Sequence, residues 1–431
     1  MIACPNDAKL FDFTNNNTRE FIESLKTFHK FYAPIHGYLC LGLCVFGMLT
    51  NLVHVAVLSR PTMRNSAVNC LLTAVAVCDL GTMCTYLIYL CHFVVFKGNK
   101  CNPTFTHGWM QFLLWHVVLS ITLHSTSLWL AVAMAFVRRM TLRVAQLNSK
   151  WQRPAMAWKV SLAIYGAVFA LCAPNILVHD IAEYTQHVWK PPARCGYSEN
   201  YTEKVYTFSV SRLATSNNCR IFKANIWMIG IVFKVIPCIL LFLLSIGLMM
   251  KLRDAERNRR KLTSCSSSSS YAGSKQSAKT DRTTLMLVVI LIVFLITELP
   301  QGIISILTAI YTADVHTYLY FYLGDVLDLL SLLNSSVNFV LYCIMSSRYR
   351  AMFWKVVLPS SMYKQQISAR NNSTTINLAS RKPSKKRSGV SERQNRDYTL
   401  LPTTELQCPS TPDTPRTNTN SSSSDGKIDH L

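Results

Sequence analysis

Seven long runs of apolar residues constrain the fold of this chain more than any other feature of its sequence. Each run has roughly 20 to 30 residues, and a helix rising about 1.5 Å per residue needs about 20 residues to cross membrane hydrocarbon. Charged residues make up only 15% of the chain, against about 25% in typical soluble domains. The approximate limits of the runs are 32–58, 67–95, 109–139, 155–178, 224–250, 284–311 and 317–345. The sequence therefore predicts an all-α membrane protein, a seven-transmembrane helix bundle.

The segments outside this bundle, which spans residues 32–345, are hydrophilic. Residues 1–31 form a polar N-terminus. Residues 346–358, "SSRYRAMFWKVVL", alternate aromatic and basic side chains, which predicts a short amphipathic helix lying on lipid at the inner membrane surface. Residues 359–431 are rich in Ser and Thr and too poor in apolar residues to fold, so we expect a disordered cytoplasmic tail.

The net charge of +22 is concentrated in alternate connections between the runs. Residues 138–159 contain six Lys or Arg and no acid, and residues 251–282 contain nine Lys or Arg. Positive residues gather in cytoplasmic loops, so we expect a multi-pass plasma-membrane protein with its N-terminus outside the cell and its C-terminus inside. The sequons at Asn16 and Asn200 then both lie outside, where N-glycosylation occurs. This distribution explains the charge without a nucleic-acid partner.

Cysteines outside the runs indicate disulfide bonding. Four of the fifteen lie in segments expected outside the cell, namely Cys4, Cys101, Cys195 and Cys219. An oxidising exterior permits disulfides there. Four cysteines allow three sets of pairs, and their spacing alone does not choose among them.

Ionisable side chains inside the runs are the main candidates for function. Asp79 lies about halfway along the second run, Glu298 in the sixth, and Asp325 and Asp328 in the seventh. The positions of Glu298 and Asp328 place them roughly 17–20 Å below the outer surface. A carboxylate in hydrocarbon costs about 2.5–3.5 kcal/mol, and Lys234 is the main cation inside the runs. We expect a hydrated cavity, open to the outside, that receives a cationic ligand; protonated and hydrogen-bonded carboxyls are the alternative.

Two prolines, Pro237 and Pro300, lie at mid-membrane in the fifth and sixth runs. Proline removes a helix hydrogen bond and bends the helix. A bend at this depth can couple an outer cavity to movement of the cytoplasmic half, although a static bend has the same pattern.

Several runs carry motif residues in a familiar order. They are Asn51 in "GMLTNLVHVAVL", Asp79, Arg138, Pro237, "TELP" at 297–300 with Phe294 one turn earlier, and "NFVLY" from Asn338 to Tyr342. Over residues 32–355 the chain thereby resembles the rhodopsin-like G-protein-coupled receptors. It departs from them beside Arg138, where Val137 and Arg139 replace the usual acid and tyrosine.

The resemblance implies roles for particular residues. Those implied in activation and coupling to a heterotrimeric G protein, of the inhibitory class, are Arg138, Tyr342, Asn338, Pro300, Phe294 and Pro237. Those implied in holding an allosteric sodium ion, with no other cofactor expected, are Asp79, Ser127, Asn334 and Asn338. The family's disulfide is matched most nearly by Cys101 and Cys195, since Leu113 occupies the usual position of its first cysteine. Phosphorylation of the tail implies arrestin-like partners.

Three further strings, "TELPQG", "HSTSLWLAVAMA" and "LLNSSVNFVLYC", resemble the invertebrate FMRFamide and myosuppressin receptors, including the nematode branch. The ligands of that group end in Arg-Phe-amide, so the resemblance implies an extracellular amidated peptide. From depth and charge, the candidate counter-ions for its arginine are Asp328, Asp325 and Glu298, in that order. His124 and Gln301 are the candidates to receive its amide or its ring.

Three other classes of function share some of these features. A chemoreceptor for small odorants has the same seven-helix architecture, and its pocket is expected to be less acidic. An ion or solute transporter can use membrane carboxylates as a proton relay, and it moves charge without a G protein. An enzyme needs a catalytic constellation, and none is visible in the sequence.

Overall fold

The computed structural model describes residues 7–96, 101–143, 150–264, 289, 292–294 and 296–358. Within these residues seven helices are long and apolar enough to cross a membrane. Their bounds are Asn16–Leu58, Ala67–Val95, His107–Thr141, Pro154–Val178, Arg212–Lys251, Ile292–Ile310 and Thr312–Ile344. The predicted seven-helix bundle is therefore confirmed. The predicted tail at 359–431 lies outside the described residues.

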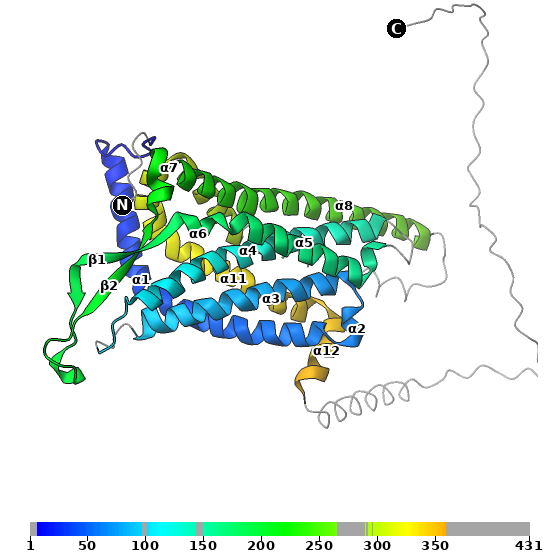
Figure 1. Cartoon of the computed structure of the whole chain (residues 1–431). Coiled ribbons are helices and arrows are strands. Elements are labelled where there is room, and N and C mark those ends of the chain that lie inside the picture. The colour runs from blue at the N-terminus through cyan, green and yellow to red at the C-terminus, as the bar shows by residue number, and fades with distance from the viewer. Residues whose placement is uncertain are drawn as a thin grey trace, which may run out of the picture. The chain divides into compact units, whose positions relative to one another are not determined.

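Figure 1 shows the helices running side by side, with a β-hairpin at one end of the bundle and α12 toward the other. We call these the hairpin end and the α12 end. The elements are α1 (Asn16–Leu58), α2 (Pro61–Arg64), α3 (Ala67–Leu90), the π-helix η1 (Cys91–Val95), α4 (His107–Arg143), the 3-10 helix η3 (Lys150–Gln152), α5 (Pro154–Cys172), α6 (Pro174–Val178), β1 (His179–Trp189), the 3-10 helix η4 (Ala193–Cys195), β2 (Glu203–Val210), α7 (Arg212–Trp227), the π-helix η5 (Met228–Val235), α8 (Ile236–Ser264), the sixth span (Ile292–Ile310), α10 (Thr312–Asp314), the π-helix η6 (Val315–Tyr320), α11 (Phe321–Met345) and α12 (Ser347–Val357).

The first helix, α1, begins at Asn16, well before the apolar run that starts at 32. The side chain of Asn15 caps it by accepting from the backbone N–H of Asn17, which satisfies an N–H group that has no partner within the helix. Ile22 is buried, so even this polar extension has an inner face. The predicted boundary between a polar N-terminus and the first span is thus not a helix boundary, because hydropathy marks where a helix enters lipid rather than where it starts.

The segment before α1, residues 7–14, is tied to the hairpin end. The Asp7 carboxylate lies 2.9 Å from Nζ of Lys223 on α7. Asp314 on α10 accepts a hydrogen bond from the backbone N–H of Leu10 at 2.7 Å. The start of the chain and the hairpin therefore lie at the same end of the bundle.

The β-hairpin is an element that the all-α prediction did not include. β1 and β2 pair antiparallel, with His179 opposite Val210 at the base of the hairpin and an irregularity after Glu183. β2 is rich in β-branched and aromatic residues, which suit a pleated and half-buried strand. A disulfide joins Cys101 to Cys195, which confirms the pairing implied by the family resemblance.

The fifth span is irregular on the hairpin side of Pro237. The chain forms the π-helix η5 over Met228–Val235, and Pro237 follows within the first turn of α8. Proline lacks the N–H that would continue the α-helical ladder, and a π-type turn is one way to accommodate that loss. This turn carries Lys234, which is important below.

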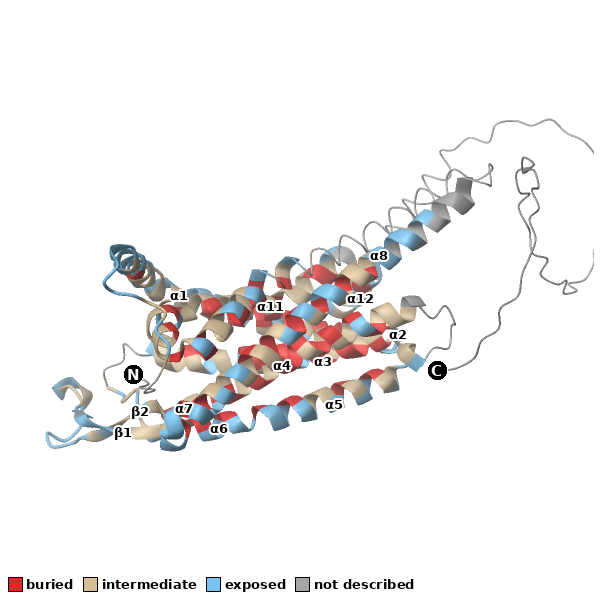
Figure 2. Cartoon of the chain, turned by 90° about the horizontal axis from the view of Figure 1, so that it is seen from above, coloured by how far each residue is buried: buried red, intermediate tan, exposed pale blue. Residues whose placement is uncertain are grey.

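The core lies between α3 and its neighbours. Ala67, Cys70, Ala74 and Cys78 of α3 are buried together with Leu130 of α4. Small side chains allow membrane helices to approach closely. Figure 2 shows that burial is concentrated on α3 and α4, whereas α5 is largely exposed along its length.

The short helix predicted at 346–358 is confirmed as α12. The Ser346 hydroxyl caps it by accepting from the backbone N–H of Tyr349 at 3.2 Å. The Tyr349 ring is fully buried, and its hydroxyl lies 2.7 Å from Nδ1 of His54 on α1. One buried hydrogen bond thus fixes α12 to the first span. Its contact with lipid stays a prediction.

Replacing Tyr349 by phenylalanine keeps the ring but leaves Nδ1 of buried His54 without a partner, and Nε2 of the same ring already has none. We expect a loss of about 1–3 kcal/mol in the free energy of unfolding, measured as a lower Tm of the purified protein in detergent. The matched control is Trp354→Phe, because Trp354 is 45% exposed on the same helix. Equal Tm values for the two variants would contradict the role given to the His54–Tyr349 bond.

Candidate functional site

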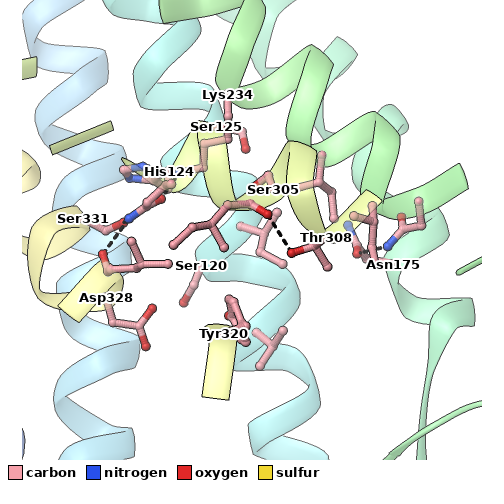
Figure 3. Close-up of a pocket in the computed structure, with 18 of the residues that line it drawn as sticks. Ser120, His124, Ser125, Asn175, Lys234, Ser305, Thr308, Tyr320, Asp328 and Ser331 are labelled. Carbon is pink, nitrogen blue, oxygen red and sulfur yellow. Dashed lines mark hydrogen bonds between the residues drawn. The ribbon is translucent and has the colours of Figure 1, made fainter. Parts of the chain in front are cut away.

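A cavity of about 430 Å³ lies inside the bundle, toward the hairpin end (Figure 3). Its wall includes His179 and Phe208 from the hairpin and Tyr320 from η6. It extends inward to Lys234 on η5 and to Asp328 on α11. The wall therefore combines aromatic side chains with one cation and one anion at separate points.

The two aspartates of the seventh span face different surroundings. Asp328 lines the cavity. Asp325 does not, and its carboxylate lies 3.9 Å from His29 and 3.9 Å from His36, both on α1. Residues three apart on a helix are neighbours but diverge by about 60°. That divergence separates an aspartate facing the cavity from one facing α1.

Glu298 is fully buried and does not line the cavity. Its Oε2 atom lies 3.2 Å from Nζ of Lys234 and 3.2 Å from Nε2 of His124 on α4. Its Oε1 atom accepts from Nδ2 of Asn334 on α11 at 3.1 Å. The carboxylate that the sequence placed in hydrocarbon therefore has three partners from three elements. We call Glu298, Lys234 and His124 the buried triad.

Two residues connect this triad with the cavity wall. The side-chain amide of Gln301 accepts a hydrogen bond from Lys234 and donates to Ser331 and to the backbone carbonyl of Leu327. His124 must donate through Nε2, because a carboxylate only accepts. Its other nitrogen, Nδ1, is buried and has no partner within the described structure. Gln301 and His124 both line the cavity.

A second pair of amides forms the wall near α6 and α7. Nδ2 of Asn225 donates to Oδ1 of Asn175 at 2.8 Å. The remaining donor of Asn175 and the remaining acceptor of Asn225 have no partner among the described residues. Beside them, burial lowers the pKa of His179, so its imidazole adds no positive charge to the wall at neutral pH.

The residues implied in sodium binding only partly converge. Asp79 accepts hydrogen bonds from Ser127 at 3.0 Å and from Asn338 at 3.2 Å. Asn334 binds Glu298 instead. Asn334 and Asn338 lie one turn apart on α11, so the seventh span carries polar contacts from the buried triad to Asp79.

The residues implied in coupling are spread along the bundle, and Arg138 and Tyr342 lie toward the α12 end. Arg138 donates to the hydroxyl of Tyr342 on α11, so tyrosine is the partner of an arginine whose usual neighbouring acid is absent. Phe294 of the sixth span is buried against Leu128 and Cys238. The wall of a small cavity of about 70 Å³ includes Arg138, Ser127, Ser245, Asn334 and Asn338. Pro300 lies in the sixth span, on the hairpin side of Phe294.

The depths of these residues in the bundle could be predicted from the sequence, but the pairing of Glu298 with Lys234 could not. The sequence does contain an indication of this pairing, because Lys234 is the main cation inside the apolar runs and lies close to Pro237. Which way its side chain points depends on the π-turn of η5, which shifts helix phase. Hydropathy carries no information on that shift.

Replacing Lys234 by methionine leaves Glu298 as a buried charge without its cation. We expect the free energy of unfolding to fall by about 3–5 kcal/mol. The double variant Lys234→Met/Glu298→Gln removes both charges, and we expect it to recover most of that loss. Thermal unfolding of purified protein in detergent measures both. If the double variant is no more stable than Lys234→Met, the ion pair does not hold these elements together.

Comparison with known proteins identifies the family to which the chain belongs. A family model described as the serpentine-type seven-transmembrane G-protein-coupled chemoreceptor Srw matches residues 39–359. The chain is 35% identical over 375 residues to the G-protein coupled receptor dmsr-1 of Caenorhabditis elegans, which covers 78% of this chain and 70% of that protein. It is 23% identical over 347 residues to the Sex peptide receptor of Drosophila melanogaster, covering 79% and 76%. The family is one of signalling receptors rather than enzymes. The chain belongs to the Srw family of seven-transmembrane G-protein-coupled receptors, multi-pass proteins of the plasma membrane.

Proposed function

We propose that this receptor binds an extracellular amidated peptide of the Arg-Phe-amide class at the 430 Å³ cavity and signals to a heterotrimeric G protein of the inhibitory class. The observation that carries the proposal is Asp328. It lines the cavity, and among the described residues no Lys, Arg or His forms an ion pair with it, whereas Asp325 and Glu298 both have nearby cations or imidazoles. Its favourable neighbours are the Tyr86 hydroxyl and the more distant Lys234, which forms no ion pair with it within 4 Å. A carboxylate that lacks a paired cation attracts a cationic ligand.

The rest of the wall suits the end of a peptide. Aromatic side chains, including Tyr86, Phe208 and Tyr320, give a surface for a phenylalanine ring. The cavity volume falls within the range of about 300–1,000 Å³ typical of ligand pockets, which is enough for a peptide terminus rather than a whole peptide.

A small cationic chemical is the second candidate ligand. The description of the Srw family as chemoreceptors favours it. A neutral odorant is disfavoured because it would leave Asp328 uncompensated. The name of the fruit-fly relative, a sex peptide receptor, favours a peptide for a chain that is similar over most of its length. Membership of a receptor family gives no support to the transporter alternative.

Signalling follows from the way the buried triad joins α4, η5 and the sixth span. A ligand that contacts Lys234 or Gln301 changes the contacts of Glu298, and it stabilises whichever arrangement of the sixth span it binds more tightly. Movement of that span below Pro300 opens the surface beside Arg138 and Tyr342, where the G protein binds. The hairpin end faces the outside and the α12 end faces the cytoplasm.

Several further expectations belong to this proposal. A sodium ion at Asp79, held by Ser127 and Asn338, favours the resting arrangement. Asn16 and Asn200 carry N-linked glycans at the outer face. The cytoplasmic tail binds arrestin after phosphorylation, and α12 lies on lipid.

The test of the proposal is G-protein activation in cells that express the full chain, challenged with Arg-Phe-amide peptides and small cationic odorants. We expect potent activation by amidated peptides alone. Silence toward the peptides with a response to the small cations, at confirmed surface expression, would transfer the function to the chemoreceptor candidate.

Asp328→Asn removes the proposed counter-ion while keeping the side-chain size. We expect peptide potency to fall about 100-fold or more, because one partner of a desolvated charge pair is lost. Asp325→Asn is the matched control one turn away, and we expect a change of less than about threefold. Equal losses in the two variants would contradict the separation of their roles. Concentration–response curves at matched surface expression measure both.

Glu298→Gln removes the charge that joins three elements while keeping an acceptor for His124. We expect a rise in ligand-independent G-protein activation, since the sixth span is then held less firmly in the resting arrangement. An unchanged basal signal at normal surface expression would show that the triad does not restrain the sixth span.

A further inference from the structure

Lys234 is a cation at the cavity wall, and one of its three N–H donors has no acceptor among the described residues. Its ammonium group has three N–H donors, of which one binds Glu298 at 3.2 Å and one binds Gln301. The residue lines the cavity, and 11% of its side chain stays exposed there. The third donor is therefore available to an acceptor atom of a ligand.

An ammonium group with a free donor would ordinarily form a site for a carboxylate. Here Glu298 lies 3.2 Å from Nζ and offsets that charge. The Lys234–Glu298 pair therefore carries no net charge. A ligand carboxylate at Lys234 also meets the negative charge of Glu298, whereas a neutral carbonyl oxygen still accepts the free hydrogen.

A primary carboxamide supplies such a neutral acceptor, because its carbonyl oxygen carries no net charge. A carboxylate at the same place brings its own negative charge close to Glu298, whose Oε2 atom lies 3.2 Å from Nζ of Lys234.

We infer that Glu298 determines the specificity of this cavity for a C-terminal carboxamide over a carboxylate. It does so without touching the ligand, by compensating the charge of Lys234 so that the inner end of the cavity accepts a neutral terminus. The inference rests on the proposed function, because it takes the ligand to be the end of a peptide.

Competition binding on membranes from cells expressing the full chain tests this directly. The probes are two peptides of one sequence, one ending in Arg-Phe-amide and the other in Arg-Phe with a free carboxylate. In Glu298→Gln the charge of Lys234 is no longer offset. We expect the ratio of amide affinity to acid affinity to fall about tenfold or more, because the acid gains an attraction that the amide does not.

Two further variants fix the sign of the effect. Lys234→Gln leaves Glu298 uncompensated, and we expect the same ratio to rise. Lys234→Gln/Glu298→Gln removes both charges, and we expect a ratio within about threefold of the wild-type value. If Glu298→Gln does not reach the cell surface, these two variants still test whether the charge balance at Lys234 sets the ratio. Asp325→Asn, which alters a carboxylate outside the cavity wall, is the control and should leave the ratio unchanged.

A purely structural role for Glu298 would lower the affinities for both peptides by the same factor. An unmoved ratio in Glu298→Gln, or ratios that move in the same direction in Glu298→Gln and Lys234→Gln, overturns the inference while leaving the proposed function intact. Failure of the wild-type receptor to bind either peptide overturns the proposed function and the inference together.

Discussion

The buried contact between Glu298 and Lys234 is the interaction on which the rest of the site depends. A carboxylate shielded from both water and lipid needs a cation and further donors, and Glu298 obtains them from η5, α4 and α11. Because the partners come from separate elements, the sixth span cannot move without changing all of these contacts. The same contact also sets the charge at the inner end of the cavity. One side chain thereby connects the wall of the cavity, through Lys234 and His124, to the sixth span.

The bundle could be predicted from the sequence because a helix that crosses lipid needs a long run of apolar residues. Seven apolar runs gave seven spans, and the amphipathic stretch after the last one gave α12. The extension of α1 to Asn16, beyond the apolar run, could not be predicted from hydropathy, because its residues are largely polar. The hairpin was missed for a similar reason. Its strands are half exposed and interrupted by an irregularity after Glu183.

The site was predictable in depth but not in direction. Distance along a helix correctly brought Glu298, Asp328 and His124 to the level of one site, because every residue adds the same rise. The direction in which a side chain points depends on the rotational phase of its helix. The π-turns η5 and η6 shift that phase by amounts that cannot be predicted from hydropathy. That is why Asp325 turned toward α1, and why Asn334 joined Glu298 rather than Asp79. Lys234 was visible in the sequence, but its partner was visible only in the folded chain.

The role of Asp328 as the counter-ion of the ligand is tested most directly by changing one functional group on the peptide. Replacing the arginine of an Arg-Phe-amide peptide by citrulline keeps its shape and removes its charge. If Asp328 receives that charge, the exchange lowers affinity about 100-fold on the wild-type receptor and less than about threefold on Asp328→Asn. Equal losses on both receptors would mean that the arginine binds elsewhere, and the account of this cavity would be wrong.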